Sequence, residues 1–238
     1  MKKAIVIGAT SGIGKGLAMI LAENGYMVGI TGRRYELLSE LRDKKPGFFV
    51  PKAFDITDRE STTAKLKELT TELGGLDLLV IGAGTGALNE QLDFETEKRT
   101  IDTNVLGFTN IADWGFNYFR KQESGHLVAI SSLGGLRGSR HAPSYNATKS
   151  YQINYLEALR QKASFLKRPI FVTDIRPGFV DTNMAQGEGI FWMATVEKAA
   201  KQIYNAIRKK KKIVYITKRW GLVAAILKRI PRFVYDRM

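Results

Sequence analysis

The sequence predicts one α/β domain, in which a doubly wound parallel sheet is covered by helices on both faces. Its 238 residues are the length of one domain or of two small ones. Short apolar runs alternate with longer stretches of helical spacing along almost the whole chain. Several of these runs are apolar on both faces, as is typical of strands in a covered parallel sheet. Repeated alternation of this kind indicates βαβ units.

The expected elements follow one another without a linker or an internal repeat. Strands are predicted at residues 4–7, 27–31, 48–54, 76–83, 126–131, 170–175 and 213–217. Helices are predicted between them, at residues 12–24, 35–44, 58–73, 94–120, 144–165 and 195–210. The residues after the last strand depart from this alternation. We therefore expect one domain over residues 1–217 and a basic amphipathic extension over residues 218–238.

The composition excludes several classes of protein. Hydrophobic residues make up 44% and charged residues 25% of the chain, which is ordinary for a globular protein and unlike a disordered or multi-span membrane protein. The absence of cysteine excludes a disulfide framework, a thiol nucleophile and a cysteine-ligated zinc site. With only two histidines, no metal site is expected.

A glycine-rich turn follows the first predicted strand and opens the first predicted helix. It reads Gly8-Ala9-Thr10-Ser11-Gly12-Ile13-Gly14. Glycines at this spacing let the main chain approach a pyrophosphate, and the helix N-terminus offers it free N–H groups. A glycine-rich turn can also be a plain tight turn, but its place between a strand and a helix favours dinucleotide binding. The predicted architecture is therefore of the Rossmann type, with cofactor contacts from Gly8, Thr10, Ser11, Gly12, Ile13 and Gly14.

Two arginines follow the second predicted strand, where a site for NAD usually carries a carboxylate. The segment reads Thr31-Gly32-Arg33-Arg34 and contains no acidic residue. A guanidinium at this place can pair with the 2′-phosphate of NADP(H). The sequence thus predicts NADP(H) as the cofactor, with Arg33 and Arg34 in contact with it. The alternative is that both arginines are a solvated helix start.

A tyrosine and a lysine occur four residues apart in the predicted helix at 144–165. Tyr145 and Lys149 therefore lie on one face of that helix. An ammonium beside the hydroxyl should lower the pKa of the phenol from about 10, which gives a general acid or base near neutral pH. Ser132, just after the preceding strand, could hold a carbonyl oxygen. Taken alone, a Tyr–Lys pair at this spacing is more often structural.

Taken together, these motifs resemble those of the short-chain dehydrogenase/reductase (SDR) family. The matching set is Gly8, Gly12 and Gly14, then Ser132, Tyr145 and Lys149, then Arg176-Pro177-Gly178 with Thr182. The motifs occur in the order and spacing of the family and reach to about residue 205. One motif departs, because Ile81-Gly82 precede Ala83 and Gly84 where the family usually has two asparagines. That departure should weaken side-chain hydrogen bonding beside the adenine ribose without removing the chemistry.

The resemblance implies a role for each matching residue. Tyr145 would be the catalytic acid or base, Lys149 would tune it and bond the nicotinamide ribose, and Ser132 would orient the substrate carbonyl. Asn104 would anchor a proton-relay water. Further cofactor contacts are implied for Asp55, Ile56, Ala83, Gly84, Pro177, Gly178, Val180 and Thr182.

The activity implied by the resemblance is NADPH-dependent hydride transfer between the nicotinamide and a carbonyl or alcohol substrate. Residues 183–194 correspond to a substrate lid. Its Met184, Phe191, Trp192 and Met193, with Gly187 and Gly189 as hinges, suit a lipophilic substrate or else pack on the core or a partner subunit. A homodimer or homotetramer is expected, formed through the helices that carry Asn104 and Tyr145. The alternative function is an NADP(H)-binding regulator on the same fold without turnover.

The net charge of +14 is concentrated at the C-terminus. Eleven basic residues and one acidic residue between Arg208 and Met238 supply +10 of it. Trp220, Val223, Leu227 and Ile230 recur at helical spacing among these cations. This pattern predicts either a membrane-surface helix or a helix packed on its own core or on a partner subunit. No nucleic-acid motif accompanies the charge, so nucleic-acid binding is not expected. The sequence shows no signal-like stretch and no membrane-spanning stretch. It therefore predicts a cytoplasmic protein, possibly one that also contacts a membrane surface.

Overall fold

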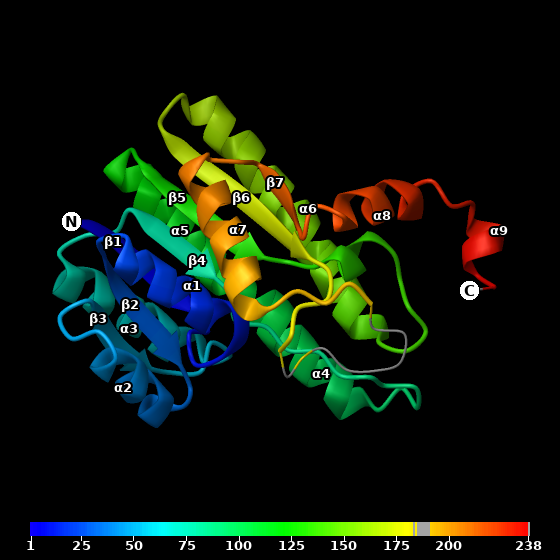
Figure 1. The fold of residues 1–238 in the computed structure, drawn as a ribbon, viewed down its shortest axis with the longest axis horizontal. Coiled ribbons are helices and arrows are strands. Elements are labelled where there is room, and N and C mark those ends of the chain that lie inside the picture. Colours follow the sequence, from blue (N-terminus) through cyan, green and yellow to red (C-terminus); the bar gives the residue numbers. More distant parts are fainter. Residues whose placement is uncertain (183, 185–190, 238) are drawn as a thin grey trace.

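The computed structural model describes residues 1–182, 184 and 191–237, and the described strands form one parallel sheet of seven in the order β3-β2-β1-β4-β5-β6-β7 (Figure 1). The strands are β1 (Lys2–Ile7), β2 (Tyr26–Gly32), β3 (Phe49–Ala53), β4 (Leu78–Ile81), β5 (Gly125–Ile130), β6 (Ile170–Pro177) and β7 (Ile213–Ile216). All seven coincide with predicted strands. The strand order reverses between β1 and β4, and ligands of such sheets bind at the carboxyl ends of the strands beside that point.

Helices cover both faces of this sheet. They are α1 (Gly12–Glu23), α2 (Tyr35–Asp43), α3 (Arg59–Leu73), α4 (Phe94–Ile101), α5 (Phe108–Gln122), α6 (Pro143–Leu166), α7 (Val196–Arg208), α8 (Trp220–Leu227) and α9 (Arg232–Tyr235). A π-helical stretch, Asp102–Gly107, joins α4 to α5, and a 3₁₀ turn, Leu133–Leu136, follows β5. The helix expected over residues 94–120 is thus interrupted at the π-helical stretch, which carries Asn104.

Alternation along each strand divides the core into two layers. Ala4 and Val6 of β1 face α1, α2 and α7, whereas Ile5 and Ile7 face α3, α5 and α6. All four side chains are fully buried. The predicted doubly wound α/β architecture is therefore confirmed.

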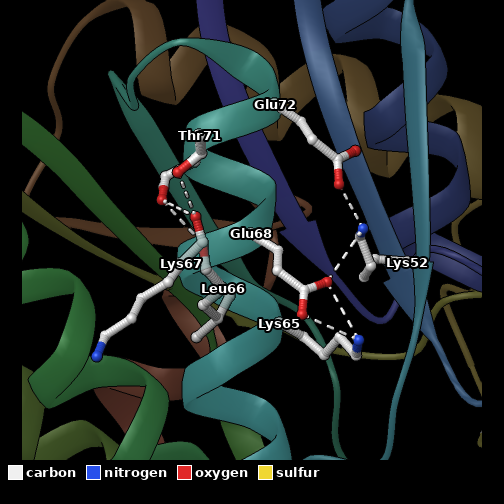
Figure 2. A network of polar contacts seen from close by, with 8 residues as sticks. Lys52, Lys65, Leu66, Lys67, Glu68, Thr71 and Glu72 are labelled. Carbon is white, nitrogen blue, oxygen red and sulfur yellow. Dashed lines mark hydrogen bonds and ion pairs between the residues drawn. The ribbon is translucent and has the colours of Figure 1, made fainter.

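The exposed edge strand β3 is attached to the helix beside it by charged side chains. Lys52 donates to Glu72 at 2.5 Å and lies 3.3 Å from Glu68, which also pairs with Lys65 (Figure 2). A lysine on an edge strand also discourages pairing with another chain. This network supports the end of the sheet that lies farthest from the C-terminal segment (Figure 1).

Candidate active site

The glycine-rich turn lies at the carboxyl end of β1. At two of its positions, Gly8 and Gly14, there is no room for a side chain. Gly8 has a φ of +86°, and a Cβ atom on it would lie 2.7 Å from the main-chain nitrogen of Ala83. A Cβ on Gly14 would lie 2.0 Å from the carbonyl oxygen of Gly8. The turn therefore packs directly on the chain that leaves β4, with Ala83 beside Gly8.

The N-terminus of α1 is open to an anion. Ser11, its N-cap residue, makes no capping hydrogen bond with its side chain, and the first turn contains no acidic residue. In contrast, Asp58 caps α3 and Asp93 caps α4. Free N–H groups and the positive end of the helix dipole fit the pyrophosphate of a dinucleotide. Gly12 lies beside Thr182, whose methyl carbon would be 3.0 Å from a Cβ on Gly12.

Both predicted arginines lie at the carboxyl end of β2, next to this turn. Arg34 donates to the hydroxyl of Thr10 at 3.1 Å. Arg33 lies 3.8 Å from a carboxylate oxygen of Asp55, in a pair whose side chains are 79% and 41% exposed. Such an exposed pair contributes little stability, so the Arg33 guanidinium is available to an anionic ligand. Asp55 itself holds the chain after β3 by accepting from the main chain and the hydroxyl of Thr57, both at 2.9 Å.

Ser132 and Tyr145 meet at the carboxyl end of β5. Ser132 is the N-cap of the 3₁₀ turn and accepts from the main chain of Gly134 at 3.0 Å. A Cβ on Gly134 would lie 3.4 Å from the hydroxyl oxygen of Ser132 and 3.5 Å from the Tyr145 ring. Lys149 follows one helical turn later, with its nitrogen 5.9 Å from the centre of that ring. The fold thus brings together the three residues predicted to carry the chemistry.

Asn104 fastens the loop after β4 to this site. Its side-chain oxygen accepts from the main-chain nitrogen of Thr85 at 2.9 Å, and its side-chain nitrogen donates to the Thr85 carbonyl at 2.7 Å and to the Thr148 hydroxyl at 3.1 Å. π-Helical turns often occur at functional sites, and this one presents Asn104 to the loop. Gly84 lies between Asn104 and Lys149, because a Cβ on it would be 3.3 Å from a side-chain atom of each.

The sequence analysis missed Gln152. This residue is 1% exposed, accepts from the Lys149 ammonium at 3.0 Å and donates to the main-chain carbonyl of Asn104 at 2.9 Å. It therefore bridges two of the predicted catalytic residues. A signal was present, since Gln152 follows Lys149 by three residues and Tyr145 by seven, which places all three on one helix face.

The electrostatics correct one prediction about Tyr145. Burial raises the pKa of Tyr145, and the nearby hydroxyl of Ser132 opposes that rise in part. The expected lowering by Lys149 is wrong for this state. Lys149 is itself buried, which lowers its pKa to about 8 while Asp174 opposes the fall. Its ammonium donates to the Ile130 carbonyl at 3.1 Å and to Gln152, rather than to the phenol.

A buried ion pair fixes the strand ends behind the site. Asp174 accepts from Arg176 at 2.7 Å and from the hydroxyl of Ser131 at 2.5 Å. Asp174 and Arg176 are 0% and 3% exposed. The hydrogen bond from Ser131 to Asp174 joins the end of β5 to β6, and Arg176 holds the Asp174 carboxylate in place. The link lies just before Ser132 on one strand and Pro177 on the other.

The remaining residues predicted to contact the cofactor, Gly178, Val180 and Ile56, are closely packed. Gly178, after Pro177, donates from its main chain to Ile216 at 2.7 Å and leaves no room for a side chain, because a Cβ would lie 2.2 Å from Trp220. Val180 and Ile56 are core residues, 4% and 9% exposed. Each therefore has little surface open to a cofactor.

The predicted lid lies partly outside the described residues. Asn183 and residues 185–190, which include both hinge glycines, are in that part of the chain. Met184, Phe191, Trp192 and Met193 are described and are 45–51% exposed. The ring of Phe191 lies 5.1 Å from that of Trp220. The described part of the segment therefore borders α8.

Comparison with known proteins identifies the family. A family model described as short chain dehydrogenase matches residues 2–190. An uncharacterized oxidoreductase of Myxococcus xanthus is 36% identical over 188 residues, which cover 77% of this chain and 74% of that protein. An uncharacterized oxidoreductase of Mycobacterium tuberculosis is 32% identical over 191 residues, which cover 77% of this chain and 75% of that protein.

Solved structures share the fold. A short chain dehydrogenase/reductase from Burkholderia phymatum, in complex with NAD, matches with a TM-score of 0.86 at 17% identity, over 94% of this chain and 92% of that one. A 3-ketoacyl-ACP reductase from Sinorhizobium meliloti matches with a TM-score of 0.80 at 23% identity, over 90% of this chain and 96% of that one. Fold, glycine turn, family match and relatives agree: the chain belongs to the short chain dehydrogenase family, whose members bind NAD(P)(H), and it is an NAD(P)-dependent oxidoreductase.

Proposed function

We propose that the protein is an NADPH-dependent carbonyl reductase with Tyr145 as its acid. The observation that carries this proposal is the convergence of Ser132, Tyr145 and Lys149 at the carboxyl end of β5. Gly84, which lies against Lys149, directly follows Ala83, which lies against the glycine turn. The open N-terminus of α1 supports dinucleotide binding at that turn. The complete set of Ser132, Tyr145 and Lys149 argues against a pure binding protein, which would need no proton donor.

Each residue has a defined part in the proposed reaction. When bound, NADPH would supply a hydride from its nicotinamide to the carbonyl carbon of the substrate. Ser132 donates a hydrogen bond that orients the carbonyl oxygen. Tyr145 gives that oxygen its phenolic proton, which completes the alcohol, and the Lys149 ammonium stabilises the phenolate left behind. With its pKa raised by burial, Tyr145 holds its proton at neutral pH, which is the form that a general acid needs.

The cofactor preference follows from Arg33 and Arg34. They lie beside the glycine turn, where a 2′-phosphate could accept charge-assisted hydrogen bonds from them. One counter-indication is Asp55, whose carboxylate approaches the same place. Because the Arg33–Asp55 pair is long and exposed, we propose that the phosphate displaces it.

The substrate is proposed to be lipophilic. The described part of the predicted lid exposes Met184, Phe191, Trp192 and Met193. Apolar side chains there would contribute about 25 cal/mol per Å² of apolar surface that a substrate covers. We also propose a homodimer or homotetramer, supported by Ile101 and Leu106, which are 40% and 62% exposed beside Asn104.

Spectrophotometry of NADPH oxidation tests the proposal. The purified protein is assayed against aldehydes and ketones from short polar to long-chain, with NADH in parallel. Tyr145→Phe should lower kcat/KM by at least about a hundredfold, the lower range of a lost general acid. The dissociation constant of NADPH, measured by fluorescence, should stay within about twofold because the variant keeps the ring. Tight NADPH binding without turnover across the panel would favour the regulator instead.

A further inference from the structure

The C-terminal segment packs one of its faces on the catalytic fold. Trp220 and Ala224 of α8 are 2% and 1% exposed and form a small core with Leu133, which follows Ser132. Val223 and Leu227 pack against the same core. The apolar face expected to meet a membrane is therefore the face that α8 turns toward its own protein.

Side-chain contacts also fix the end of this segment. Arg137 donates to the carbonyls of Leu227 and Ile230 at 3.2 and 2.9 Å, and its guanidinium lies 4.0 Å from the centre of the Tyr235 ring. Tyr235 in turn donates to the carbonyl of Gly138 at 2.5 Å. Residues 220–235 are thus joined to the loop between Ser132 and Tyr145, and they form a rigid part of the molecule next to its site.

The opposite face of the segment is apolar and uncovered. Leu222 and Ile226, one turn apart on α8, are 72% and 62% exposed. Phe233 and Val234 of α9 are 68% and 41% exposed. Figure 1 shows α8 and α9 projecting away from the sheet, past β7, and the exposed fractions show that these four side chains are largely uncovered. We refer to these four residues as the outer ridge.

Six exposed cations belong to the same segment as the outer ridge. Residues 218–237 contain Lys218, Arg219, Lys228, Arg229, Arg232 and Arg237 against the single acid Asp236, so the six positive charges and one negative charge give +5. Within the described chain, none of these side chains takes part in an ion pair. The surface thus offers apolar side chains and unneutralised positive charge together.

This surface continues to the described end of the predicted lid. The guanidinium of Arg219 lies 5.8 Å from the centre of the Trp192 ring, and Trp192 lies 6.1 Å from Trp220. Trp192 and its neighbour Phe191 are about half exposed. Tryptophan prefers the boundary between water and lipid, where its ring is apolar and its N–H is polar.

We propose that the outer ridge, with the cations around it and Phe191 and Trp192 beside it, is a docking surface for an anionic lipid membrane. Apolar side chains flanked by lysine and arginine are what an interfacial segment needs, since the first enter the lipid and the second pair with headgroups. The described residues contain no helix with the length and hydropathy to span a bilayer, so the attachment is peripheral. Docking would place Phe191 and Trp192, at the described end of the predicted lid, at the lipid surface.

The charge argues against the other occupants. A second copy of the chain, related by a twofold axis, would bring the same cations opposite one another, which is unfavourable. A nucleic acid would match the charge but would leave Leu222, Ile226 and Phe233 uncovered, because phosphates make no use of apolar side chains. An anionic membrane satisfies both parts of the surface at once.

Co-sedimentation with lipid vesicles tests docking without any substrate, so its result is independent of the proposed reaction. The full chain is mixed with vesicles of phosphatidylcholine alone or of phosphatidylcholine with phosphatidylglycerol. We expect binding to the anionic vesicles only, and its loss at high salt. Lys228→Gln/Arg232→Gln should lower the partition coefficient at least about tenfold. Lys209→Gln/Lys212→Gln removes equal charge from the other end of β7 and should change it less than about twofold.

A second pair of variants tests the apolar part. Leu222→Asn/Ile226→Asn should also lower the partition coefficient at least about tenfold, whereas Phe165→Asn, at an 87% exposed position on α6, should not. Both proteins should keep full activity on a water-soluble carbonyl compound, because neither change touches the site. Failure of the unchanged protein to bind anionic vesicles would overturn the proposal. So would equal binding by all variants, or a change in oligomeric state of Leu222→Asn/Ile226→Asn in place of a change in lipid binding.

Discussion

The side-chain oxygen of Gln152 accepts a hydrogen bond from the ammonium of Lys149 at 3.0 Å, in a place where both side chains are buried. The amide nitrogen of Gln152 is simultaneously bound to the carbonyl of Asn104 at 2.9 Å. Gln152 thereby fixes the position of the ammonium and links α6 to the π-helical turn. It touches no reacting atom, so we regard it as a positioning residue.

Substitutions of Gln152 should shift the pH dependence of the reaction in opposite directions. Gln152→Leu removes an acceptor from a buried ammonium whose pKa is already lowered to about 8, so that pKa should fall further. If reduction requires charged Lys149, the fall in kcat/KM at high pH should move to lower pH by about one unit. Gln152→Glu introduces a negative charge beside the ammonium, which should raise the pKa of Lys149 and move the fall in kcat/KM to higher pH.

The matched control is Gln161, an exposed residue on the same helix. Gln161→Leu and Gln161→Glu should leave the pH profile of kcat/KM unchanged. A merely structural role for Gln152 predicts lower activity in both Gln152 variants with no movement of the profile, and that result would refute the positioning role.

The burial of charged Lys149 should lower the free energy of unfolding at neutral pH. This destabilisation should become smaller as the pH rises. Its pKa is about 8 in the folded protein, against an ordinary value of 10.5. Between these values the unfolded chain holds a proton that the folded chain has lost, so folding becomes more favourable as pH rises. Compared with Lys149→Met, the wild type should gain up to about 1.4 kcal/mol per pH unit in this window.

Urea denaturation across this range measures that gain as the difference in free energy of unfolding between the two proteins. Lys121→Met, at an exposed position of α5, should show no such trend. A constant difference between wild type and Lys149→Met from neutral to alkaline pH would mean that burial does not lower the pKa of Lys149.

Arg33 and Arg34 should determine the choice between cofactors. Arg33→Ala/Arg34→Ala should raise KM for NADPH at least about tenfold, since each hydrogen bond to a charged group contributes roughly 1.5–3 kcal/mol. KM for NADH, which has no 2′-phosphate, should change less than about twofold. Arg120→Ala, an exposed change on α5, is the control. An equal loss with both cofactors would show that the arginines only hold the start of α2.

The sheet was predictable because its strands are apolar on both faces, whereas contacts between distant segments were not. Residues 94–120 read as one helix, and nothing local marks the π-helical turn, which is held by bonds from Asn104 to Thr85. The direction of the Tyr145 pKa shift was wrong for a related reason. Spacing alone places Lys149 beside Tyr145, but the burial that raises the pKa comes from the packing of several segments.

The orientation of the C-terminal segment also depends on contacts between distant segments. Helical periodicity correctly predicted α8 but could not say which side would face the protein. Both sides of α8 carry apolar residues, Trp220 and Ala224 on one and Leu222 and Ile226 on the other. Trp220 is turned inward because Gly178, a residue without a side chain, leaves space for its ring.

His126, to which the sequence assigned no function, should make the protein less stable in acid. It lies at the start of β5, is 8% exposed and is hydrogen-bonded to the hydroxyl of Thr173 at 2.8 Å. Burial, with a smaller effect of Lys210, lowers its pKa from 6.5 to about 4. As pH falls from 6.5 to about 4, the unfolded chain takes up a proton that the folded chain does not bind, so stability is lost by up to about 1.4 kcal/mol per pH unit.

The variant His126→Gln keeps a hydrogen-bond partner for Thr173 but cannot titrate. It should lower the free energy of unfolding by about 1 kcal/mol near neutral pH, and in acid it should no longer be less stable than the wild type. Denaturation by urea at several pH values, with exposed His141→Gln as the control, measures the difference. If wild type and His126→Gln lose stability in parallel as the pH falls, the acid sensitivity arises from other groups. His126, the buried one of the two histidines, would then not be the group that titrates between these pH values.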